Sequence, residues 1–412
     1  MSLIAHHYFP LGSDNIGDHL VAHALRLALA RHLGSVRFVD MPVNDRYRNG
    51  DRAIGLLGEN VDHTNSEADL VVVGGSNLLE PRRPRREKPG RTNWSWGVFT
   101  NDESLARLAP PVLLLGMGTG SDFGKSIRPY SQTAIPQIRK LHEQAIASAV
   151  RDQTTVDRLA EIGVHTTCTG CPVTFLTNRP VAKADSSLPL LVSLPPSRIL
   201  KRITGRLFMS GAVRYVRWLE AQGVPIVVTL HETNDLAVAR QYLPKSVEVF
   251  YTEDVDELIA RYEQSQGVVG FRLHAALLGL GLGKPVLPVG VDWRGQAFVE
   301  TFGLQQISIR PGRLGQFRKL RACTEQLLAG DAELITLLSE AKARFGSRYE
   351  AFLSRAATKL ESSCLQDKLL RSTARERMVN TEPLAPSIRE PRAQATGAKE
   401  RHLAFDRPAG VG

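Results

Sequence analysis

The chain has few cysteines, few aromatic residues and no long apolar run, and each shortage argues against a class of protein. Four cysteines among 412 residues are too few for the disulfide framework of a small secreted domain, and they fit a reducing compartment. No segment reaches the roughly 18 consecutive apolar residues that a membrane-spanning helix needs. The first residues, MSLIAHHYFPLGSDNIGD, have no basic start and no continuous apolar stretch. We therefore expect no signal peptide and a cytoplasmic protein.

Positive charge is concentrated in one segment. The formal net charge is +10, and residues 80–91 (EPRRPRREKPGR) hold six basic residues among three prolines. The prolines exclude a helix, so we expect an exposed basic loop. No aromatic residues are interleaved with the basic ones and no nucleic-acid module is recognisable, so we expect no nucleic-acid partner. A solvated loop and a peripheral contact with the inner face of a membrane both remain open.

Short apolar runs alternate with helical patterns, which is typical of parallel α/β architecture. In the first half the expected strands are residues 3–9, 36–40, 69–75, 111–118 and 146–152. In the second half they are residues 190–196, 225–230, 247–251, 267–271 and 285–291. The fold class we predict is α/β, with two facing Rossmann-like domains.

The length favours two domains, and a polar, turn-rich segment at residues 177–189 separates them. We predict one Rossmann-like domain over residues 1–180 and a second over 186–310. Amphipathic patterns over 311–365 predict bracing helices. Residues 366–412 are rich in Arg, Glu, Ala and Pro without apolar periodicity, so we expect a disordered tail there.

Small and polar residues follow several expected strands. Ligands of parallel α/β sheets gather at the carboxyl ends of strands, beside helix N-termini that attract anions. The loops of the first half contain Asn15, Gly17 and Asp18, then Gly74, Gly75, Ser76 and Asn77, then Gly118. Glycine-rich strand ends are common, and none of these matches a phosphate-binding P-loop or a clear dinucleotide fingerprint. Three such loops in the first half of the chain nevertheless predict a ligand-binding cleft there.

Charged residues end two further strands. Arg151 and Asp152 lie in SAVRDQTT, where an ion pair that caps the next helix is the structural alternative to ligand binding. His231 and Glu232 lie in VVTLHETND, where a surface histidine is the alternative.

The strongest signal is GFRLHAALLGLGLGKPVLPVGVD, residues 270–292. In an extended segment Arg272 and His274 would share one face while Leu273 points into the core. A buried unpaired charge costs several kcal/mol, so we expect an anionic ligand to pair with them. The alternative is a buried Arg–His pair bonded to main-chain carbonyls.

Cys168 and Cys171 form a CxxC. Zinc would need a second ligand pair, and Cys323 and Cys364 lie far away without a matching motif. We interpret the segment as a tight turn and expect no metal.

Taken in order, NIGD, VVVGGSNLL, GMGTG, VRDQTTVDRLAEIG, TGCP and FRLHAALLGLGLGKPVLPVGVD resemble the polysaccharide pyruvyl transferases. The resemblance covers about residues 10–305. It implies two Rossmann-like domains in a GT-B-like arrangement. It also implies transfer of the enolpyruvyl group of phosphoenolpyruvate to a sugar hydroxyl pair, which gives a pyruvate ketal and phosphate without a further cofactor.

Carried over by position, the resemblance implies that Arg272, Leu273 and His274 line the donor site and that Arg151 holds the donor's anionic groups. Asn15, Gly17 and Asp18 match the family's N-terminal cleft motif. Two positions depart from the pattern. Asp292 is followed by WRGQ where members often have a lysine, so Arg294 takes that role or none does. Cys171 stands where many members have aspartate, which indicates a divergent subgroup.

Phosphoenolpyruvate carries about three negative charges, for which Arg272, Arg151 and helix N-termini would compensate, and His274 is the candidate acid. The expected acceptor is a cell-surface or exopolysaccharide precursor, lipid-linked in one version of this hypothesis. Two alternatives remain. One is a GT-B glycosyltransferase that uses a nucleotide sugar and contacts its ribose near residues 292–296. The other is a non-catalytic protein that binds anionic surfaces through residues 80–91.

Overall fold

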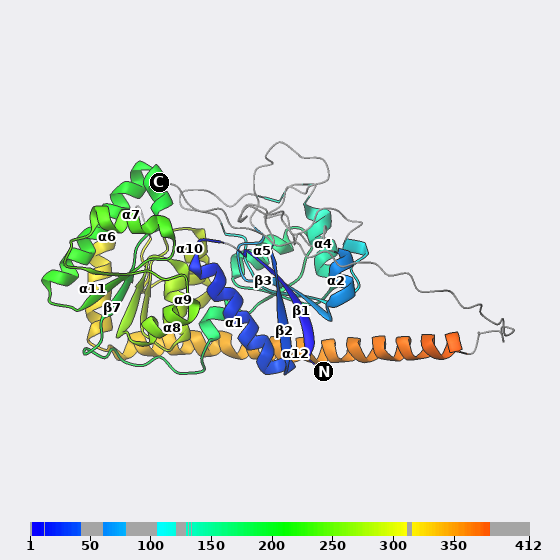
Figure 1. Cartoon of the computed structure of the whole chain (residues 1–412). Coiled ribbons are helices and arrows are strands. Elements are labelled where there is room, and N and C mark those ends of the chain that lie inside the picture. Colours follow the sequence, from blue (N-terminus) through cyan, green and yellow to red (C-terminus); the bar gives the residue numbers. More distant parts are fainter. Residues whose placement is uncertain are drawn as a thin grey trace, which may run out of the picture. The chain divides into compact units, whose positions relative to one another are not determined.

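A computed structural model describes residues 2–11, 13–42, 61–79, 105–120, 129–130, 132, 134–310 and 315–379. The basic segment 80–91 lies outside the described residues. Contacts divide the chain into two units, Met1–Ser363 and Cys364–Gly412. Both sheets belong to the first unit, and Figure 1 shows each sheet with helices on its faces.

The first sheet has six parallel strands in the order β2-β1-β3-β4-β5-β6. Its strands are β1 (Leu3–Phe9), β2 (Val36–Pro42), β3 (Leu70–Gly74), β4 (Val112–Met117), β5 (Ala145–Val150) and β6 (Thr167–Cys168). Strands β3 and β4 are buried along their whole length, as continuous apolar runs covered on both faces should be. The five expected strands are confirmed, and the two-residue β6 was not expected.

The second sheet has five parallel strands in the order β11-β10-β7-β8-β9. Its strands are β7 (Leu190–Ser193), β8 (Ile226–Thr229), β9 (Glu248–Phe250), β10 (Gly267–Gly270) and β11 (Val286–Pro288). All five expected strands are confirmed, each shorter than its apolar run. The two-sheet α/β fold predicted from the sequence is therefore present.

Helices connect the strands in both sheets. The first half contains α1 (Ile16–Leu33), α2 (Val61–Glu67), α4 (Ile135–Gln144), α5 (Gln153–Ala160) and the 3-10 helix η2 (Pro172–Phe175). The second half contains η3 (Ser197–Lys201), α6 (Ile203–Ala221), α7 (Thr233–Tyr242), α8 (Val255–Glu263), α9 (Leu273–Gly281) and α10 (Trp293–Phe302). The last two are α11 (Gln316–Leu328) and α12 (Ala332–Val379). None of the helices in the described part of the chain is long and apolar enough to cross a membrane.

The strand orders fix where a ligand can lie. The order reverses between β1 and β3 in the first sheet and between β7 and β10 in the second. In open α/β sheets helices leave such points on opposite faces, and ligands bind at the carboxyl ends of the strands there. Helix α1 contacts both α8 and α9, and α5 contacts α10, so elements of the two halves meet directly.

Helix α12 packs against both halves. The ring of Phe345 stacks on Phe302 of α10, and Tyr349 stacks on Phe175 of η2, with centroids 4.4 and 4.8 Å apart. The helix extends to Val379, beyond residue 365, where the sequence analysis placed the end of the bracing helices.

A buried lysine joins α12 to the segment between the sheets. Lys342 is 7% exposed, and its Nζ donates to the carbonyl oxygens of Arg179 and Gly281 at 2.8 and 3.0 Å. Burial lowers its pKa to about 8, with a smaller effect from Arg179. The carbonyl of Gly281 is at the C-terminal end of α9, where the helix dipole favours a cation.

Replacing this lysine should destabilise the protein more than replacing an exposed one on the same helix. Lys342→Ala leaves buried carbonyls without their donor, and we expect it to lower the free energy of unfolding by about 1–3 kcal/mol. Lys359 donates to the carbonyl of Ile146 from an exposed position, so Lys359→Ala should stay within about 0.5 kcal/mol. Urea unfolding of both variants measures the difference, and equal losses would contradict the bracing role of Lys342.

Candidate functional site

Five helices begin where strands of the two sheets end: α1, α5, α7, α9 and α10. The start of α1 touches the second half, because Ile16 N donates to the carbonyl of His231 at 3.1 Å. The start of α5 touches α10, because Gln153 N donates to Thr301 Oγ1 at 3.0 Å. Helix N-termini carry partial positive charge and free N–H groups, so their convergence favours an anion.

Seven ionisable side chains lie at or next to the N-termini of these five helices. We call them the strand-end cluster: Asp18, Arg151, Glu232, Arg272, His274, Asp292 and Arg294. Two of the five helices, α7 and α9, begin without a side-chain cap hydrogen bond. Asn15, Asp152 and Asp292 cap the other three.

Asp18 joins two of the predicted loops. It is buried, and its two carboxylate oxygens accept from Ser13 Oγ and Ser76 Oγ, both at 2.9 Å. Burial raises the pKa of Asp18, and the two serine hydroxyls offset part of that rise. Asn15 Oδ1 caps α1 by accepting from Gly17 N at 3.0 Å. The NIGD and GGSN motifs therefore form one hydrogen-bonded unit.

Gly17 is the contact between α1 and α9. A β-carbon at Gly17 would lie 2.0 Å from Nδ1 of His274 and 2.7 Å from its Cγ. Only glycine allows the imidazole to lie this close to the α1 backbone. The two motifs that the sequence placed in separate halves are therefore in direct contact.

The other predicted glycines each have a local packing role. A β-carbon at Gly74 would lie 1.9 Å from the carbonyl of Leu115, and Gly75 has a φ of 88°. A β-carbon at Gly118 would lie 2.3 Å from Nε of Arg151, so this glycine makes room for the guanidinium.

Arg151 is held by two side chains. It donates to Oδ1 of Asn77 and lies 3.4 Å from Oδ2 of Asp152. Asn77 in turn donates to the carbonyl of Gly120 at 2.8 Å. Asp152 caps α5 through the main-chain N–H of Thr155 at 2.8 Å. The local ion pair considered from the sequence therefore exists, and it fixes a buried guanidinium at the end of β5.

Arg272 has partners that the sequence argument did not foresee. It donates to Oε1 of Glu232 at 2.6 Å and to Oδ2 of Asp235, and its main-chain N–H donates to Ser193 Oγ at 3.0 Å. Burial would raise the pKa of Glu232, but Arg272 and Arg198 together hold it below its usual value. The expectation that Arg272 needs an anionic ligand as its partner is wrong, because two carboxylates of the chain already pair with it.

The geometry expected around Leu273 is also wrong. The extended segment ends at Arg272, and Leu273 is the first residue of α9. Leu273 is half-buried instead of pointing into the core. His274 therefore lies in the first turn of a helix, where its side chain points back toward the N-terminus.

His274 is the member of the cluster whose imidazole lacks a partner. It is 6% exposed, and among the described residues nothing hydrogen-bonds to its Nε2. Burial holds its pKa well below the usual value, and Arg151, Arg294, His231 and Arg272 lower it further. The imidazole is therefore neutral at neutral pH, with a buried nitrogen surrounded by cations.

His231 is buried rather than on the surface, so the surface alternative is wrong. It is 1% exposed, and its Nε2 lies 3.3 Å from the hydroxyl of Tyr262. Burial, followed by Arg272, lowers its pKa to about 3. Its carbonyl receives the first N–H of α1, so this residue helps to hold the two halves together.

Asp292 and Arg294 complete the cluster from the second half. Asp292 caps α10 by accepting from the N–H groups of Arg294 and Gly295, both at 3.1 Å. It also accepts from Nε of Arg294 at 2.9 Å. Burial would raise the pKa of Asp292, but Arg294 keeps it low. A β-carbon at Gly120 would lie 2.6 Å from Cγ of Arg294, so this arginine reaches the glycine-rich loop of the first half.

The CxxC shows no sign of reactivity. Cys168 and Cys171 are buried free thiols. Burial raises the pKa of Cys168 to about 12 and that of Cys171 to about 11. Both are therefore protonated at neutral pH, which agrees with a packed turn.

One trio among the described residues could hold a metal ion: His6 on β1 with His63 and Glu67 on α2, with ligand atoms within 4.8 Å of one another. The side chains of His63 and Glu67 are about half exposed, at 45% and 50%. His6 is buried, and burial, then His63, lowers its pKa, with Arg37 acting in the same direction. The trio shares no residue with the strand-end cluster.

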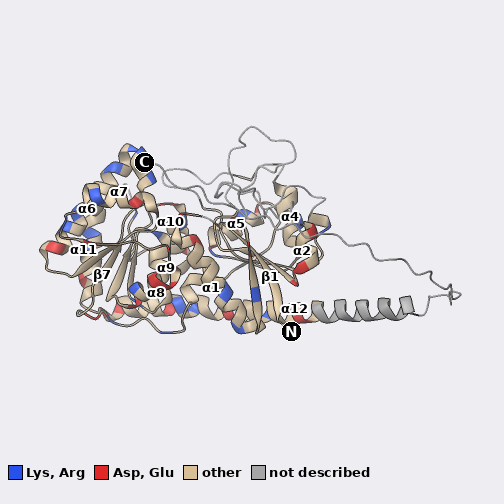
Figure 2. Cartoon of the chain, viewed as in Figure 1, with Lys and Arg blue, Asp and Glu red and all other residues tan. Residues whose placement is uncertain are grey.

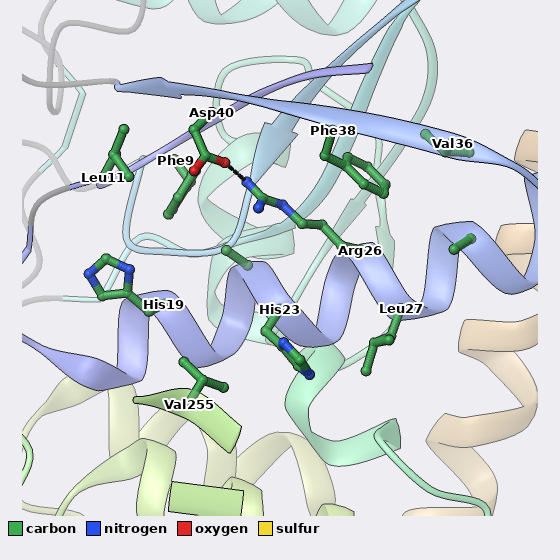
Figure 3. Close-up of a pocket in the computed structure, with 12 residues that line it drawn as sticks. Phe9, Leu11, His19, His23, Arg26, Leu27, Val36, Phe38, Asp40 and Val255 are labelled. Atoms are coloured by element: carbon green, nitrogen blue, oxygen red, sulfur yellow. Dashed lines mark hydrogen bonds and ion pairs between the residues drawn. The ribbon is translucent and has the colours of Figure 1, made fainter. Parts of the chain in front are cut away.

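A hollow of about 430 Å³ opens beside α1 (Figure 3). Its wall includes Phe9 and Phe38, whose ring centroids lie 5.1 and 5.5 Å from the guanidinium carbon of Arg26. Arg26 also pairs with Asp40, as the dashed line shows. The residues that line it do not include His274, so this hollow is distinct from the strand-end cluster.

Comparison with known proteins assigns the fold and the family. A model of the family "Polysaccharide pyruvyl transferase" matches residues 15–292, about two thirds of the chain. The chain belongs to the polysaccharide pyruvyl transferase family. The match begins at the residue that caps α1 and ends at the residue that caps α10, so it contains every member of the strand-end cluster except Arg294.

Solved structures show the same fold at low identity. A protein described as a UDP-N-acetylglucosamine 2-epimerase, from Listeria monocytogenes, is 14% identical with a TM-score of 0.50, over 87% of this chain and 94% of that one. MnaA of S. aureus with UDP is 12% identical with a TM-score of 0.49, over the same shares. The likeness to the Listeria monocytogenes protein supports a GT-B-like fold for this pyruvyl transferase family member. No curated protein matches the chain.

Sequence reasoning missed three residues of this family member's site: Ser13, Ser193 and Asp235. Each acts through a hydrogen bond to a residue that was predicted. Asp235 had a usable signal, because an acid in the first turn of a helix after a strand lies at the ligand edge of the sheet. The serines had none, since a single hydroxyl at a strand end has many uses.

Adding a methyl group at Gly17 should separate α1 from α9. We expect Gly17→Ala to lower the free energy of unfolding by about 1–3 kcal/mol, because the β-carbon overlaps His274. Gly346→Ala is the matched control, since a β-carbon at that helical position meets nothing closer than 3.7 Å. The control should gain up to about 1 kcal/mol from helix propensity. Urea unfolding decides, and a gain for both variants would disprove the contact.

Buried neutral histidines should make stability depend on pH above the range where carboxylates titrate. The pKa of His231 is near 3 in the folded chain and about 6.5 in the unfolded chain. As the pH falls, His231 is therefore protonated in the unfolded chain before it is protonated in the folded chain. The free energy of unfolding consequently falls as the pH drops below about 6.5. His231 alone should account for roughly 2 kcal/mol at pH 5. Unfolding at pH 7.5 and 5 tests this, and His231→Gln should reduce the difference.

Proposed function

We propose that this chain transfers the enolpyruvyl group of phosphoenolpyruvate to a pair of saccharide hydroxyls and forms a pyruvate ketal. Family membership supports the transferase class and a role in polysaccharide biosynthesis. The observation that carries the finer proposal is His274, a neutral imidazole with a buried unpartnered Nε2 among arginines. Such a group is poised to gain a proton when an anion arrives.

Donor binding would use Arg151, Arg294 and the uncapped start of α9. Arg272 is already paired with Glu232 and Asp235, so we assign it a positioning role. The carboxylates of Glu232 and Asp235 hold Arg272, and with it the end of β10, against α7. This fixes the orientation of the His274 side chain. The phosphate and carboxylate of phosphoenolpyruvate would then be bound by two guanidinium groups and by main-chain N–H donors.

Binding of the donor would change the proton affinity of His274. In the free site, burial and neighbouring arginines lower its pKa. A bound phosphate and carboxylate would offset those positive charges and raise the pKa, so Nε2 could hold a proton. His274 would give this proton to the methylene carbon of the donor, leaving an oxocarbenium-like centre at the adjacent carbon.

The bonds then balance in one addition and one substitution at that carbon. One acceptor hydroxyl adds to the centre and loses its proton. The bond from carbon to the phosphate oxygen breaks, and the second hydroxyl takes its place and closes the ketal with loss of its own proton. One of these protons returns to His274, which restores the site for the next turnover, and the other leaves with the phosphate.

The acceptor we propose is a cell-surface or exopolysaccharide precursor, in a cytoplasmic reaction near the inner face of a membrane. A nucleotide sugar as donor is less well supported. The acidic residue at the expected ribose position, Asp292, already caps α10 and pairs with Arg294. The hypothesis of a non-catalytic surface-binding protein depends on residues 80–91, which lie outside the described part of the chain.

Removing the His274 imidazole should abolish transfer while leaving donor binding measurable. We expect His274→Gln to lower phosphate release from phosphoenolpyruvate, in the presence of a saccharide acceptor mixture, by about 10²–10⁴-fold. His142→Gln is the matched control. It removes another imidazole whose Nε2 has no partner and whose pKa burial lowers to about 4, yet no arginine contributes to that shift. The control should keep full activity.

Calorimetry separates the donor classes. Phosphoenolpyruvate should bind the wild type and His274→Gln. It should bind Arg151→Gln at least tenfold more weakly. Nucleotide sugars should not bind at the concentrations at which phosphoenolpyruvate binds. Binding of a nucleotide sugar without binding of phosphoenolpyruvate would overturn the proposal in favour of a glycosyltransferase. Full transfer by His274→Gln would remove the proposed acid.

A further inference from the structure

Two large apolar side chains project into solvent at the start of α6. Ile203 and Leu207 are 76% and 67% exposed, whereas the other exposed large apolar residues among those described are at most 40% exposed. They are four positions apart, so they share one face of the helix. The opposite face of the helix packs into the core, since Phe208 and Met209 are buried there. Burying Ile203 and Leu207 would be favourable, and nothing within the described residues covers them.

Basic residues surround this apolar pair. Between Ser197 and Trp218 the chain has six basic residues and no acidic one. Lys201, Arg206 and Arg214 are exposed, and Arg214 follows Leu207 along the same helical face. Figure 2 shows this concentration of basic residues on α6. Exposed aliphatic side chains within a basic surface are complementary to an anionic bilayer. The aliphatic side chains can enter the acyl boundary, and the basic side chains can contact the lipid phosphates.

The segment has a fixed shape. Gly205 allows the first turn of α6 to press against η3, because a β-carbon there would lie 1.9 Å from the carbonyl of Ile199. Ile199 itself is 1% exposed and anchors η3 in the core. The apolar pair is therefore presented on a packed support, which keeps the ordering entropy of docking low.

This support is connected to the strand-end cluster. Arg198 of η3 donates to Oε1 of Glu232 at 3.0 Å, and Glu232 in turn pairs with Arg272. The ring of Phe208 on α6 packs on Phe271, the residue before Arg272, with centroids 5.8 Å apart. A surface docked through α6 would thus lie on elements that hold the proposed donor site.

We propose that residues 197–214, comprising η3 and the first turns of α6, form a docking surface for an anionic phospholipid bilayer. Ile203 and Leu207 enter the interfacial region, and Lys201, Arg206 and Arg214 contact lipid phosphates. The surface shares no residue with the basic segment 80–91. It gives the enzyme access to acceptors that are held at a membrane, and this last consequence rests on the proposed function.

Co-sedimentation of the full chain with vesicles tests the surface without any donor or acceptor. The wild type should bind vesicles of equal parts phosphatidylcholine and phosphatidylglycerol, and bind pure phosphatidylcholine at least tenfold more weakly. Ile203→Ser with Leu207→Ser should weaken binding to the mixed vesicles at least tenfold, and Lys201→Glu with Arg214→Glu should do the same. Added salt should weaken binding of the wild type.

The matched control is Leu27→Ser with Val249→Ser, which removes two other exposed apolar side chains, at 40% and 38% exposure. This control should bind vesicles as the wild type does. Thermal unfolding of every variant shows whether it is folded, and only folded variants are compared. Phosphate release with a water-soluble acceptor should be unchanged in the α6 variants, so failure of docking and failure of the proposed reaction give different results.

Three outcomes would overturn the proposal. One is vesicle binding that survives Ile203→Ser with Leu207→Ser, since binding would then be a general attraction to polyanions, as for heparin. Another is binding that is lost only when Arg82, Arg83, Arg85 and Arg86 are replaced by glutamate, since the contact would then belong to residues 80–91. The third is the absence of wild-type binding to the anionic vesicles.

Discussion

Close contact between the His274 imidazole and the Gly17 backbone is the constraint on which the site depends. Gly17 lies in the first turn of α1, in the first half, and His274 lies in the first turn of α9, in the second half. The two can meet because Gly17 has no side chain. The contact buries the imidazole and brings it under the influence of Arg151 from one half and Arg294 from the other. A neutral, buried histidine is the consequence of bringing the two strand ends together.

Charge compensation around Arg272 decides which groups remain for a ligand. A buried guanidinium without partners would cost several kcal/mol, and Glu232 and Asp235 remove that cost within the chain. Arg272 can therefore hold α7 and α9 in register before any donor binds. The groups that we propose for the donor are Arg151, Arg294 and the uncapped start of α9, beside the unpartnered Nε2 of His274.

The sequence predicted the strands well because their signal is local, whereas the site depends on pairs that are not. Apolar runs such as LVVVG are buried on both faces, so composition alone reveals them. Arg272 and Glu232 are forty positions apart. They meet because the strands that precede them, β10 and β8, lie on either side of β7 in the sheet. The start of α9 at Leu273 was also missed, since the residues before it continue the extended pattern. Asp18, Arg151 and His274 were found, because strand ends collect at one edge of a parallel sheet.

The same burial that makes His274 neutral explains how one residue could give and take a proton in a single turnover. An acid must hold a proton when the donor is bound and must be able to recover it after phosphate leaves. If its pKa were fixed above neutral, the free site would hold a buried cation beside two arginines, which repulsion disfavours. A pKa that is low in the free site and rises with a bound anion couples protonation to occupancy. In the proposed reaction the arginines would serve two linked purposes, because they would attract the donor and keep the imidazole unprotonated until the donor arrives.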